Sequence, residues 1–423
     1  MITYVDKLFE EEIPWDWFCL RLLSKNGRTV CSSLKKLRNN KPNCMKTTYL
    51  LIAILIFGAC NRTTQESKPS SQDILTIEVK ESDIIDSGKL SDVISIDSLV
   101  FLEYTDESII GKIDKVLVSE DRIFVVDRHS AKSIFCFDRK GNFINSYNAI
   151  GRGPQEYLEI FDASFFRDKM YVFAEPNQFF VLDKNLKLEK SIDINWTDDI
   201  PLDPDYPYFS VINSETILFY HPSAHYHYHL YNLSKQAFIS SHITRLGTLD
   251  VSNHRNLTKN TSGKMFLSRF YNDTIYTVSQ NLMTPEYIIN FEKPMTDNEI
   301  EERLKQNAYN SFNHPRPQKM YNVSSFIYNE EYISFEFEFK RSGHFCFYNP
   351  EKNIKNIFNN SLENDLFQWT YLRSSIGHHQ NSNITWLDVT GLVDNKEEIS
   401  FSIPDDLSYD SNSALVFYRP KFE

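Results

Sequence analysis

The 423-residue chain holds 57 acidic and 45 basic residues, which gives it a formal net charge of −12. This charge argues against nucleic acid and anionic lipid surfaces as partners. Hydrophobic residues make up 41% of the sequence and aromatic residues 14%, so the chain has ample material for a large core.

A short secretory signal is predicted at residues 45–59. Met45 is followed by a lysine and by the apolar run 49–57, after which comes Gly58-Ala59. A basic start, a short apolar run and small residues are typical of a cleaved signal peptide, and the run is too short to cross a membrane. Because residues 1–44 would precede this signal, we interpret Met45 as the translation start and 1–44 as an over-extended gene start. The alternative is a cytoplasmic tail with an uncleaved anchor.

The end of this signal resembles a bacterial lipobox, which implies that the Cys60 thiol is lipidated and anchors the mature protein in the membrane. The alternative is an ordinary signal peptide that a cysteine happens to follow. Residues 60–73 contain no large apolar side chain and predict a flexible tether. Cys136 and Cys346 lie in apolar strands, which predicts buried free thiols rather than a disulfide framework or a zinc site.

A strand motif recurs along the rest of the chain. Its copies start at residues 122, 169, 216, 264, 331 and 414. The first three intervals are 47 or 48 residues, the length of one four-stranded propeller blade. Alternating β-branched and aromatic residues indicate strands, most clearly at 122–127, 133–138 and 143–148. We therefore predict an all-β, six-bladed β-propeller over residues 74–423, in which the copy at 414 can be a different strand of the sixth blade. The alternative is a pair of large β-sandwiches.

One helix is predicted within the repeat. Residues 296–299 (TDNE) form a capping box, and Ile300, Leu304 and Ala308 follow at helical spacing. This pattern predicts an inserted helix of about four turns at 296–310, which explains the longer interval before residue 331.

The ring of blades must also close. Pairing strands from the two chain ends within one blade removes the open sheet edge. The candidates are 74–79 and 99–104 at the N-terminal end and 414–418 at the C-terminal end.

Residues 150–157 (IGRGPQEY), which we name the glycine loop, place two of the 12 glycines of the chain on either side of Arg152. Glycines so placed indicate a positive φ or a close approach of the backbone to another group, and Pro154 favours an extended Gly153. We predict a stiff, sharply bent loop that presents Arg152, Glu156 and Tyr157.

Three segments carry a resemblance to a known family: residues 151–157, residues 272–276 (NDTIY) and residues 412–418 (NSALVFY). Together with the lipobox, they resemble the six-bladed β-propeller lipoproteins of Bacteroidetes-type bacteria, which are distantly similar to NHL-repeat propellers. Gln155 stands where a third glycine is expected. The resemblance implies the fold and an outer-membrane lipoprotein that faces the periplasm or the cell surface. It implies no activity, because one fold hosts many functions.

Candidate ligand-binding residues are expected on one face of the propeller. The turn between the second and third strands of a blade and the link to the next blade emerge on the same face, which places His129 beside the glycine loop and the inserted helix on the same side. Arg152 can present a bidentate fork to a carboxylate or to sugar hydroxyls, with Glu156, Tyr157 and His129 as further candidates. The alternative is that Arg152 and Glu156 brace neighbouring blades.

Four histidines cluster at His221, His225, His227 and His229, and the last three would share one face of a strand. Three imidazoles can ligate a metal, but tyrosines interleave them and no acidic residue or cysteine accompanies them. We therefore predict a hydrated or aromatic-stacked hairpin and neither a metal nor a cofactor. The aromatic stretches 206–208 and 226–228 offer flat rings for sugar or peptide stacking, unless these rings fill gaps between blades.

No phosphate-binding glycine loop and no recognisable catalytic triad occur in the sequence. The sequence therefore favours a lipid-anchored envelope protein that binds a glycan, a peptide or an envelope protein on its loop face. One alternative is a hydrolase or a lyase whose site lies at the channel mouth and draws its residues from separate blades. Another is a structural subunit of an envelope complex.

Overall fold

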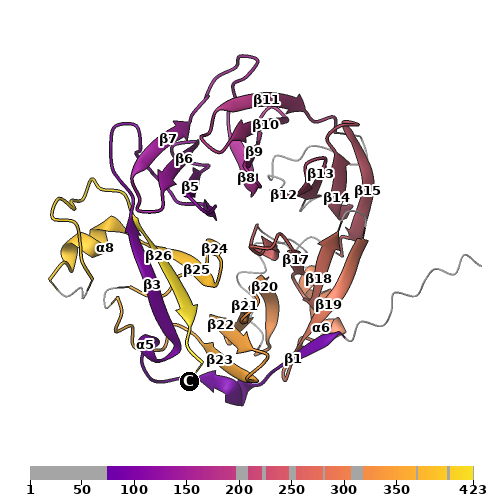
Figure 1. The fold of residues 1–423 in the computed structure, drawn as a ribbon. Helices are drawn as coiled ribbons and strands as arrows, with labels where there is room; N and C mark the ends of the chain where they lie inside the picture. The colour runs from indigo at the N-terminus through magenta and orange to yellow at the C-terminus, as the bar shows by residue number, and fades with distance from the viewer. Residues whose placement is uncertain are drawn as a thin grey trace, which may run out of the picture. The chain divides into compact units, whose positions relative to one another are not determined.

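The computed structural model describes residues 74–196, 208–221, 225–246, 254–279, 282–305, 318–367, 370–397 and 401–422. The predicted signal peptide, Cys60 and the tether lie outside these residues. The strands of the described residues form six sheets, arranged as blades around a common centre (Figure 1). The predicted six-bladed β-propeller is therefore confirmed. No helix in these ranges is long and apolar enough to span a membrane.

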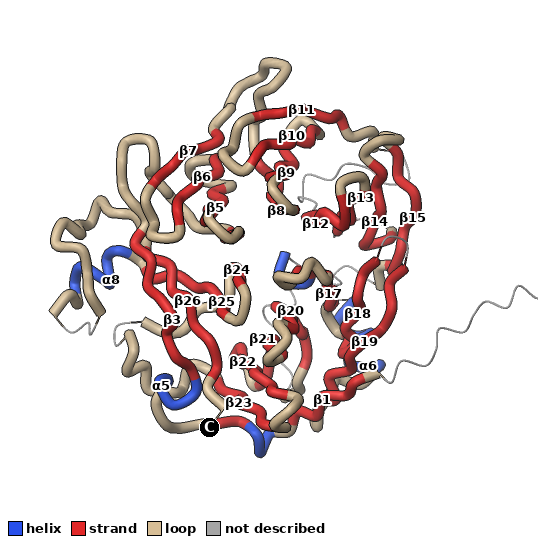
Figure 2. The backbone as a smooth tube through the Cα atoms, viewed as in Figure 1, coloured by secondary structure: helices blue, strands red, loops and turns tan. Residues whose placement is uncertain are grey.

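Blades I, II and III are antiparallel sheets of four consecutive strands, with the first strand nearest the centre of the ring and the fourth outermost (Figure 2). Blade I consists of β4 (Lys115–Val118), β5 (Arg122–Asp127), β6 (Ser133–Asp138) and β7 (Phe143–Tyr147). Blade II consists of β8 (Ile160–Phe166), β9 (Lys169–Ala174), β10 (Gln178–Asp183) and β11 (Leu188–Asp193). Blade III consists of β12 (Tyr208–Asn213), β13 (Thr216–Tyr220), β14 (Tyr226–Asn232) and β15 (Ala237–Thr244).

Blades IV, V and VI are less regular, because strands from the N-terminal end join them. Blade IV consists of β16 (Leu257–Lys259), β17 (Met265–Arg269), β18 (Asn272–Ser279), β19 (Leu282–Phe291) and the outermost β1 (Leu75–Val79). Blade V consists of β20 (Tyr321–Tyr328), β21 (Ile333–Phe339), β22 (Ser342–Asn349), β23 (Ile354–Phe358) and the outermost β2 (Ile84–Ile85). Blade VI consists of β24 (Gly377–His379), β25 (Ser382–Leu387), β26 (Ala414–Pro420) and β3 (Ile94–Phe101).

The sequence repeat marks the second strand of each of the first five blades, from β5 to β21. The copy at residue 414 begins β26, which is the third strand of blade VI, whereas the second strand is β25. The last interval in the sequence is therefore longer because it connects different strands of two blades.

Closure joins the two chain ends in blade VI. The C-terminal β26 pairs antiparallel with β3, which confirms 414–418 as a closing strand and places its partner at Ile94–Phe101. The other N-terminal candidate, 74–79, was wrong as a closing strand, because β1 pairs parallel with β19 at the outer edge of blade IV. The turn between β6 and β7 packs against the end of β3. Glu103 donates its amide N–H to the Gly141 carbonyl (2.8 Å), and a Cβ at Gly141 would lie 2.0 Å from the Phe101 carbonyl oxygen.

The predicted helix begins at its capping box but is shorter than expected. Helix α6 (Asp297–Leu304) is capped by Thr296, whose hydroxyl accepts the Glu299 amide while the Glu299 carboxylate returns to Thr296. It ends after about two turns, and Ala308 lies outside the described residues. The prediction of a single helix was also wrong, since α5 (Leu90–Val93) precedes β3 and α8 (Val389–Asp394) lies between β25 and β26.

The core is divided among the gaps between blades. Six apolar clusters occur in the described residues, and each joins the facing surfaces of two adjacent blades, including blades VI and I. Because every blade buries both of its faces, β5 and β9 are apolar at nearly every position. The predicted free thiols belong to this core: Cys136 and Cys346 are fully buried and unbridged, and burial raises the pKa of both.

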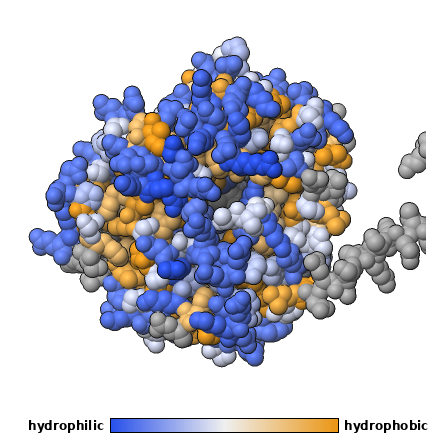
Figure 3. All heavy atoms as spheres, viewed as in Figure 1, coloured by the Kyte–Doolittle hydropathy of each residue, from blue (hydrophilic) through white to orange (hydrophobic). Residues whose placement is uncertain are grey.

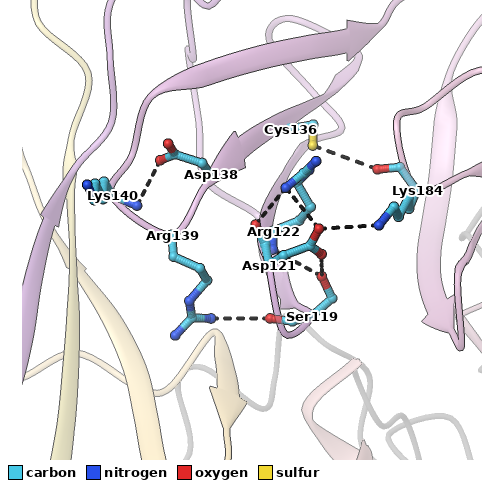
Figure 4. A network of polar contacts seen from close by, with 8 residues as sticks. All are labelled: Ser119, Asp121, Arg122, Cys136, Asp138, Arg139, Lys140 and Lys184. Carbon is cyan, nitrogen blue, oxygen red and sulfur yellow. Dashed lines mark hydrogen bonds and ion pairs between the residues drawn. The ribbon is translucent and has the colours of Figure 1, made fainter.

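The ring has two flat faces. We name the loop face as the one formed by turns such as β5–β6 and by the links between blades, and the turn face as the one formed by turns such as β4–β5 and β6–β7. Hydrophilic residues cover most of the face seen in Figure 3. A polar network of the turn face joins blades I and II, where Asp121 forms ion pairs with Arg122 (3.0 Å) and with Lys184 (3.3 Å) (Figure 4).

Candidate functional site

The glycine loop is closed at its base by backbone hydrogen bonds. The Gly151 amide donates to the Tyr157 carbonyl and the Tyr157 amide donates to the Ala149 carbonyl, both over 2.9 Å. Across the loop, the Gly153 amide donates to the Glu156 carboxylate at 2.6 Å. These contacts produce a bent loop that is closed on itself. Of the three side chains that it was predicted to present, Arg152 and Glu156 are exposed, whereas Tyr157 is buried because its ring packs in the core.

The two glycines are needed for close approach rather than for a positive φ. A Cβ on Gly151 would lie 1.9 Å from the Glu156 Oε2 atom, and a Cβ on Gly153 would lie 3.1 Å from its carboxylate carbon. Glu156 is exposed, but its carboxylate folds back against both glycines and accepts the Gly153 amide, which holds the loop in shape.

Tyr157 anchors the loop to the core. Its side chain is fully buried, and its hydroxyl donates to the carbonyls of Lys132 (2.7 Å) and Tyr147 (3.3 Å). Burial raises the pKa of Tyr157 to about 12, so the hydroxyl keeps the proton that it donates. The ring supports the loop from beneath and is covered by protein.

Arg152 is the exposed tip of the loop. The guanidinium forms no hydrogen bond or ion pair with any other residue that the structure describes. The closed loop thus presents an exposed planar fork of N–H donors that is unpaired within the described chain.

His129 lies on the β5–β6 turn, which is side by side with the end of the glycine loop, as expected. The contact runs through Lys132, whose amine reaches the Leu158 carbonyl and the Glu159 carboxylate, both at 3.2 Å. His129 itself is half exposed and lies 3.9 Å from the Asp114 carboxylate and 3.3 Å from the Arg128 guanidinium. No contact joins His129 to Arg152 in the described residues.

A buried carboxylate holds this turn in place. Asp127 is fully buried and accepts the amides of Gly111 (2.9 Å), Lys112 (2.8 Å) and Ser130 (2.8 Å). Lys112 in turn forms an ion pair with Asp114 at 2.8 Å, in which the lysine is half exposed and the carboxylate mostly buried. The side chains that reach solvent around this turn thus include both amines, such as that of Lys112, and the Glu159 carboxylate, while the carboxylates of Asp114 and Asp127 lie beneath them.

Sequence reasoning missed the polar contacts at the inner ends of the blades. On one side of the channel mouth, Lys115 of β4 donates to Asp162 of β8 (2.9 Å), which also accepts the amide of Phe209 in β12 (3.1 Å). These three residues stand 47 positions apart, so the blade repeat itself was the signal that could have found them.

A second network lies between blades IV, V and VI. Arg255 pairs with Glu336 (2.9 Å) and donates to the Ser374 hydroxyl (2.7 Å), which donates to the same carboxylate at 2.6 Å. No sequence period links these positions, because inserted segments separate the blades.

The histidine cluster is an aromatic-packed part of blade III. His221, His227 and His229 are buried, and they pack edge-on against aromatic rings of the same blade region at 5.6–6.2 Å between centroids. Within the described ranges, no three His, Cys, Asp or Glu side chains are arranged to hold a metal ion. Tyr228 is also fully buried, so its ring fills the core, whereas Tyr226 is partly exposed.

Fold and site define a six-bladed propeller that carries a closed, arginine-tipped loop on one face. The chain belongs to the family described as Domain of unknown function (DUF4934), which matches residues 74–419. No curated protein sequence matches the chain.

The chain is also similar to a crystal structure of a "putative exported protein" from Bacteroides fragilis NCTC 9343, with a TM-score of 0.64 and 14% identity over 82% of this chain and 100% of that one. A structure of YCF48 bound to a D1 peptide gives a TM-score of only 0.32, with 11% identity over 62% of this chain and 74% of that one. In all, 725 solved chains match, so the fold is widely shared and does not itself identify a function.

Proposed function

We propose that the protein is a lipid-anchored propeller of the bacterial envelope that binds a ligand or a protein partner at its loop face through the glycine loop. The ligand class that suits the site carries a carboxylate or adjacent hydroxyls, on a glycan or a peptide. Arg152 supplies the recognition fork, His129 and Lys112 supply nearby N–H donors, and Glu156 and Tyr157 hold the loop.

One observation carries this proposal: Arg152 is exposed, is unpaired within the described residues and lies on a loop that the Gly153–Glu156 hydrogen bond closes. An arginine that braces two blades would form ion pairs or hydrogen bonds with the neighbouring blade, as Arg128 of blade I does with the Phe161 carbonyl of blade II (2.6 Å). A loop that is already ordered before binding loses less conformational entropy when the ligand arrives, which favours affinity.

The envelope location rests on two further observations. The 45–59 segment has the pattern of a signal peptide, and Cys60 follows its small residues. The structurally similar protein from Bacteroides fragilis is named as exported. The test is metabolic labelling with palmitate followed by mass spectrometry of the membrane fraction. We expect an acylated N-terminal Cys60 and no peptides from residues 1–44; recovery of those peptides from the membrane form would contradict this part.

Binding is tested with the purified full chain on glycan and peptide arrays. We expect saturable binding to acidic glycans or acidic peptides, and at least a tenfold loss for Arg152→Ala, because one charge-assisted bidentate contact contributes about 1.5–3 kcal/mol. Lys140→Ala is the matched control, since it removes one exposed positive charge from the turn face of the same blade. Equal binding by wild type and Arg152→Ala would overturn the proposed role of the loop.

An enzymatic function is the second candidate, and Asp273 is the observation that favours it. Asp273 follows the β17–β18 turn on the loop face, and burial raises its pKa to about 6. A carboxyl group that titrates near neutral pH can serve as a general acid or base. Two residues before it, Tyr271 stacks on Tyr321 at 6.1 Å, and the Tyr321 hydroxyl donates to Glu338.

This candidate predicts turnover in a panel of hydrolase and lyase substrates, and loss of that turnover in Asp273→Asn without loss of folding. Saturable binding without any product would favour the binding function instead.

A further inference from the structure

The turn-face end of the channel holds two cations that share one aromatic ring. Lys259 ends β16 of blade IV, and its amine lies 4.4 Å from the centroid of the Phe166 ring, which ends β8 of blade II. The guanidinium carbon of Arg167 lies 5.2 Å from the same ring. The amine also donates to the carbonyl of Val211 in β12 of blade III at 3.0 Å. Three innermost strands therefore meet at one lysine.

Blade VI reaches the same place. The ring of His378 in β24 is hydrogen-bonded to the backbone of Lys259, and the Gln380 amide donates to the Thr261 hydroxyl at 2.9 Å. The end of the channel is thus lined by β8, β12, β16 and β24, and Lys259 touches or joins each of them.

Neither cation has a carboxylate partner among the described residues. Asp168 follows Arg167 directly, but it is exposed and forms no ion pair with it. Some other cations of the turn face are paired, since Asp121 joins Arg122 and Lys184 (Figure 4). Arg139 is not, within the described chain: it donates to the Ser119 carbonyl and lies over the Phe417 ring. Lys264 is a close comparison: its amine also lies over a ring, that of Phe266 at 5.7 Å, but it forms an ion pair with Glu286.

An unpaired cation in this position is costly. Lys259 is half-buried, and burial lowers its pKa to about 8, so most of the amine still carries its charge at pH 7. A charge that is removed from water is normally paired with an opposite charge. An ammonium group has three N–H donors. That of Lys259 donates one N–H to the Val211 carbonyl, and its charge lies over the Phe166 ring. An anion would complete its coordination and compensate its charge.

The neighbouring groups suit a small anion. Arg167 offers a planar fork that matches the two oxygens of a carboxylate. Burial lowers the pKa of His378 and of His379 to about 4, so both rings are neutral at pH 7. The N–H of His378 is used on the Lys259 backbone, and the ring of His379 can offer its own N–H without adding a charge. The half-buried Phe166 provides an apolar wall for the body of the ligand.

We propose that the turn-face end of the channel is a binding site for a small oxyanion, a carboxylate or a phosphate, held by Lys259 and Arg167 beside the Phe166 ring. This site lies at the opposite face from the glycine loop and is independent of the function proposed there.

The proposal is tested by isothermal titration of the full chain with citrate and with inorganic phosphate at low ionic strength. We expect one saturable site, weakened at least tenfold by Lys259→Met and by Arg167→Gln, because each removes a charged donor. Lys264→Met is the matched control and should bind like the wild type, as should Arg152→Ala. The tighter of the two probes identifies the anion as a carboxylate or a phosphate.

A second measurement needs no variant. The lysines are ¹³C-methylated, and the pKa of Lys259 is followed by NMR with and without the anion. A bound anion should raise this pKa, since a nearby negative charge favours the charged amine, and the pKa of Lys264 should move less. The proposal is overturned if the wild type binds neither probe, if Lys259→Met and Lys264→Met bind alike, or if the pKa of Lys259 does not respond.

Discussion

The inner ends of blades I to III and of blades IV and V are joined in different ways. In the first region one buried carboxylate, Asp162, joins three blades by accepting from the Lys115 amine and from the Phe209 amide. In the second region, side chains of β16 and the preceding turn reach separate carbonyls of blade V: Asn256 reaches Val323 and Thr258 reaches Phe326.

This difference indicates where a single substitution should destabilise the ring most. The joint of blades I to III is centred on one buried charge, which is stabilised only while its partners are in place. The joint of blades IV and V divides the same task between the Arg255–Glu336 ion pair and neutral hydrogen bonds, each of which contributes about 1 kcal/mol. A single substitution should therefore loosen the first region much more than the second.

The largest effect is expected where the two regions meet at the closure. Deleting residues 411–423 removes β26, leaving the edges of β25 and β3 unpaired and exposing the apolar cluster between blades VI and I. We expect aggregation or degradation instead of cooperative folding. The measurement is size-exclusion chromatography with a thermal melt. A monomeric truncation that melts cooperatively would show that closure contributes little.

Asp162→Ala tests the charged joint directly. It leaves the Lys115 amine without its carboxylate and two amides with one acceptor fewer, which should cost about 3–5 kcal/mol of unfolding free energy. Urea denaturation measures this cost, with Asp168→Ala as the control, since Asp168 is an exposed aspartate beyond the end of the same strand. A cost below about 1 kcal/mol would remove the contrast between the regions.

Acid should weaken blade III through His229. Its side chain is buried beside the Ser241 hydroxyl, and burial lowers its pKa to about 4 from 6.5. Because the unfolded chain binds the proton more readily, the stability from the neutral ring is complete above pH 6.5 and declines as the pH falls towards 4. The loss is roughly 3 kcal/mol at most. His229→Gln should flatten this part of the stability profile, measured by denaturation from pH 7 to pH 4; an unchanged profile would contradict it.

Thr258→Val tests one neutral hydrogen bond between blades IV and V. The substitution keeps the shape of the side chain and removes the hydroxyl that donates to the Phe326 carbonyl. We expect a cost of about 1 kcal/mol, measured in the same denaturation series as Asp162→Ala. If Thr258→Val costs as much as Asp162→Ala, the second region is no more distributed than the first.

The same contrast explains what could be predicted from sequence. In blades I to III the links are short, so strand periodicity gave the blade length and the strands β5, β6 and β7 almost to the residue. In blades IV to VI, the segments that contain helices α6 and α8 break the period, and the added strands β1 and β2 come from the chain before the first copy of the repeat. The parallel pairing of β1 with β19 depends on contacts some 210 residues apart along the chain, which no local pattern records.

For the glycine loop, the sequence predicts the bent backbone but not the orientation of the side chains. Two scarce glycines around Arg152 indicated a constrained loop, but whether Glu156 pointed outward or inward depended on a hydrogen bond that spacing does not reveal. The two cations at the turn-face end come from two separate blades, so no linear motif brings Lys259 to Phe166.

The smallest effect on stability is expected at the tip of the glycine loop. Arg152→Ala removes an exposed side chain with no partner among the described residues, so the free energy of unfolding should change by less than about 0.5 kcal/mol. Tyr157→Phe, at the base of the same loop, removes a buried hydroxyl that donates to Lys132 and Tyr147, which should cost about 1 kcal/mol or more. Thermal melts of the two variants beside the wild type separate recognition from support. If Arg152→Ala lowers the melting temperature as much as Tyr157→Phe does, the arginine stabilises the fold by bracing the blades, and its proposed role in ligand recognition is contradicted.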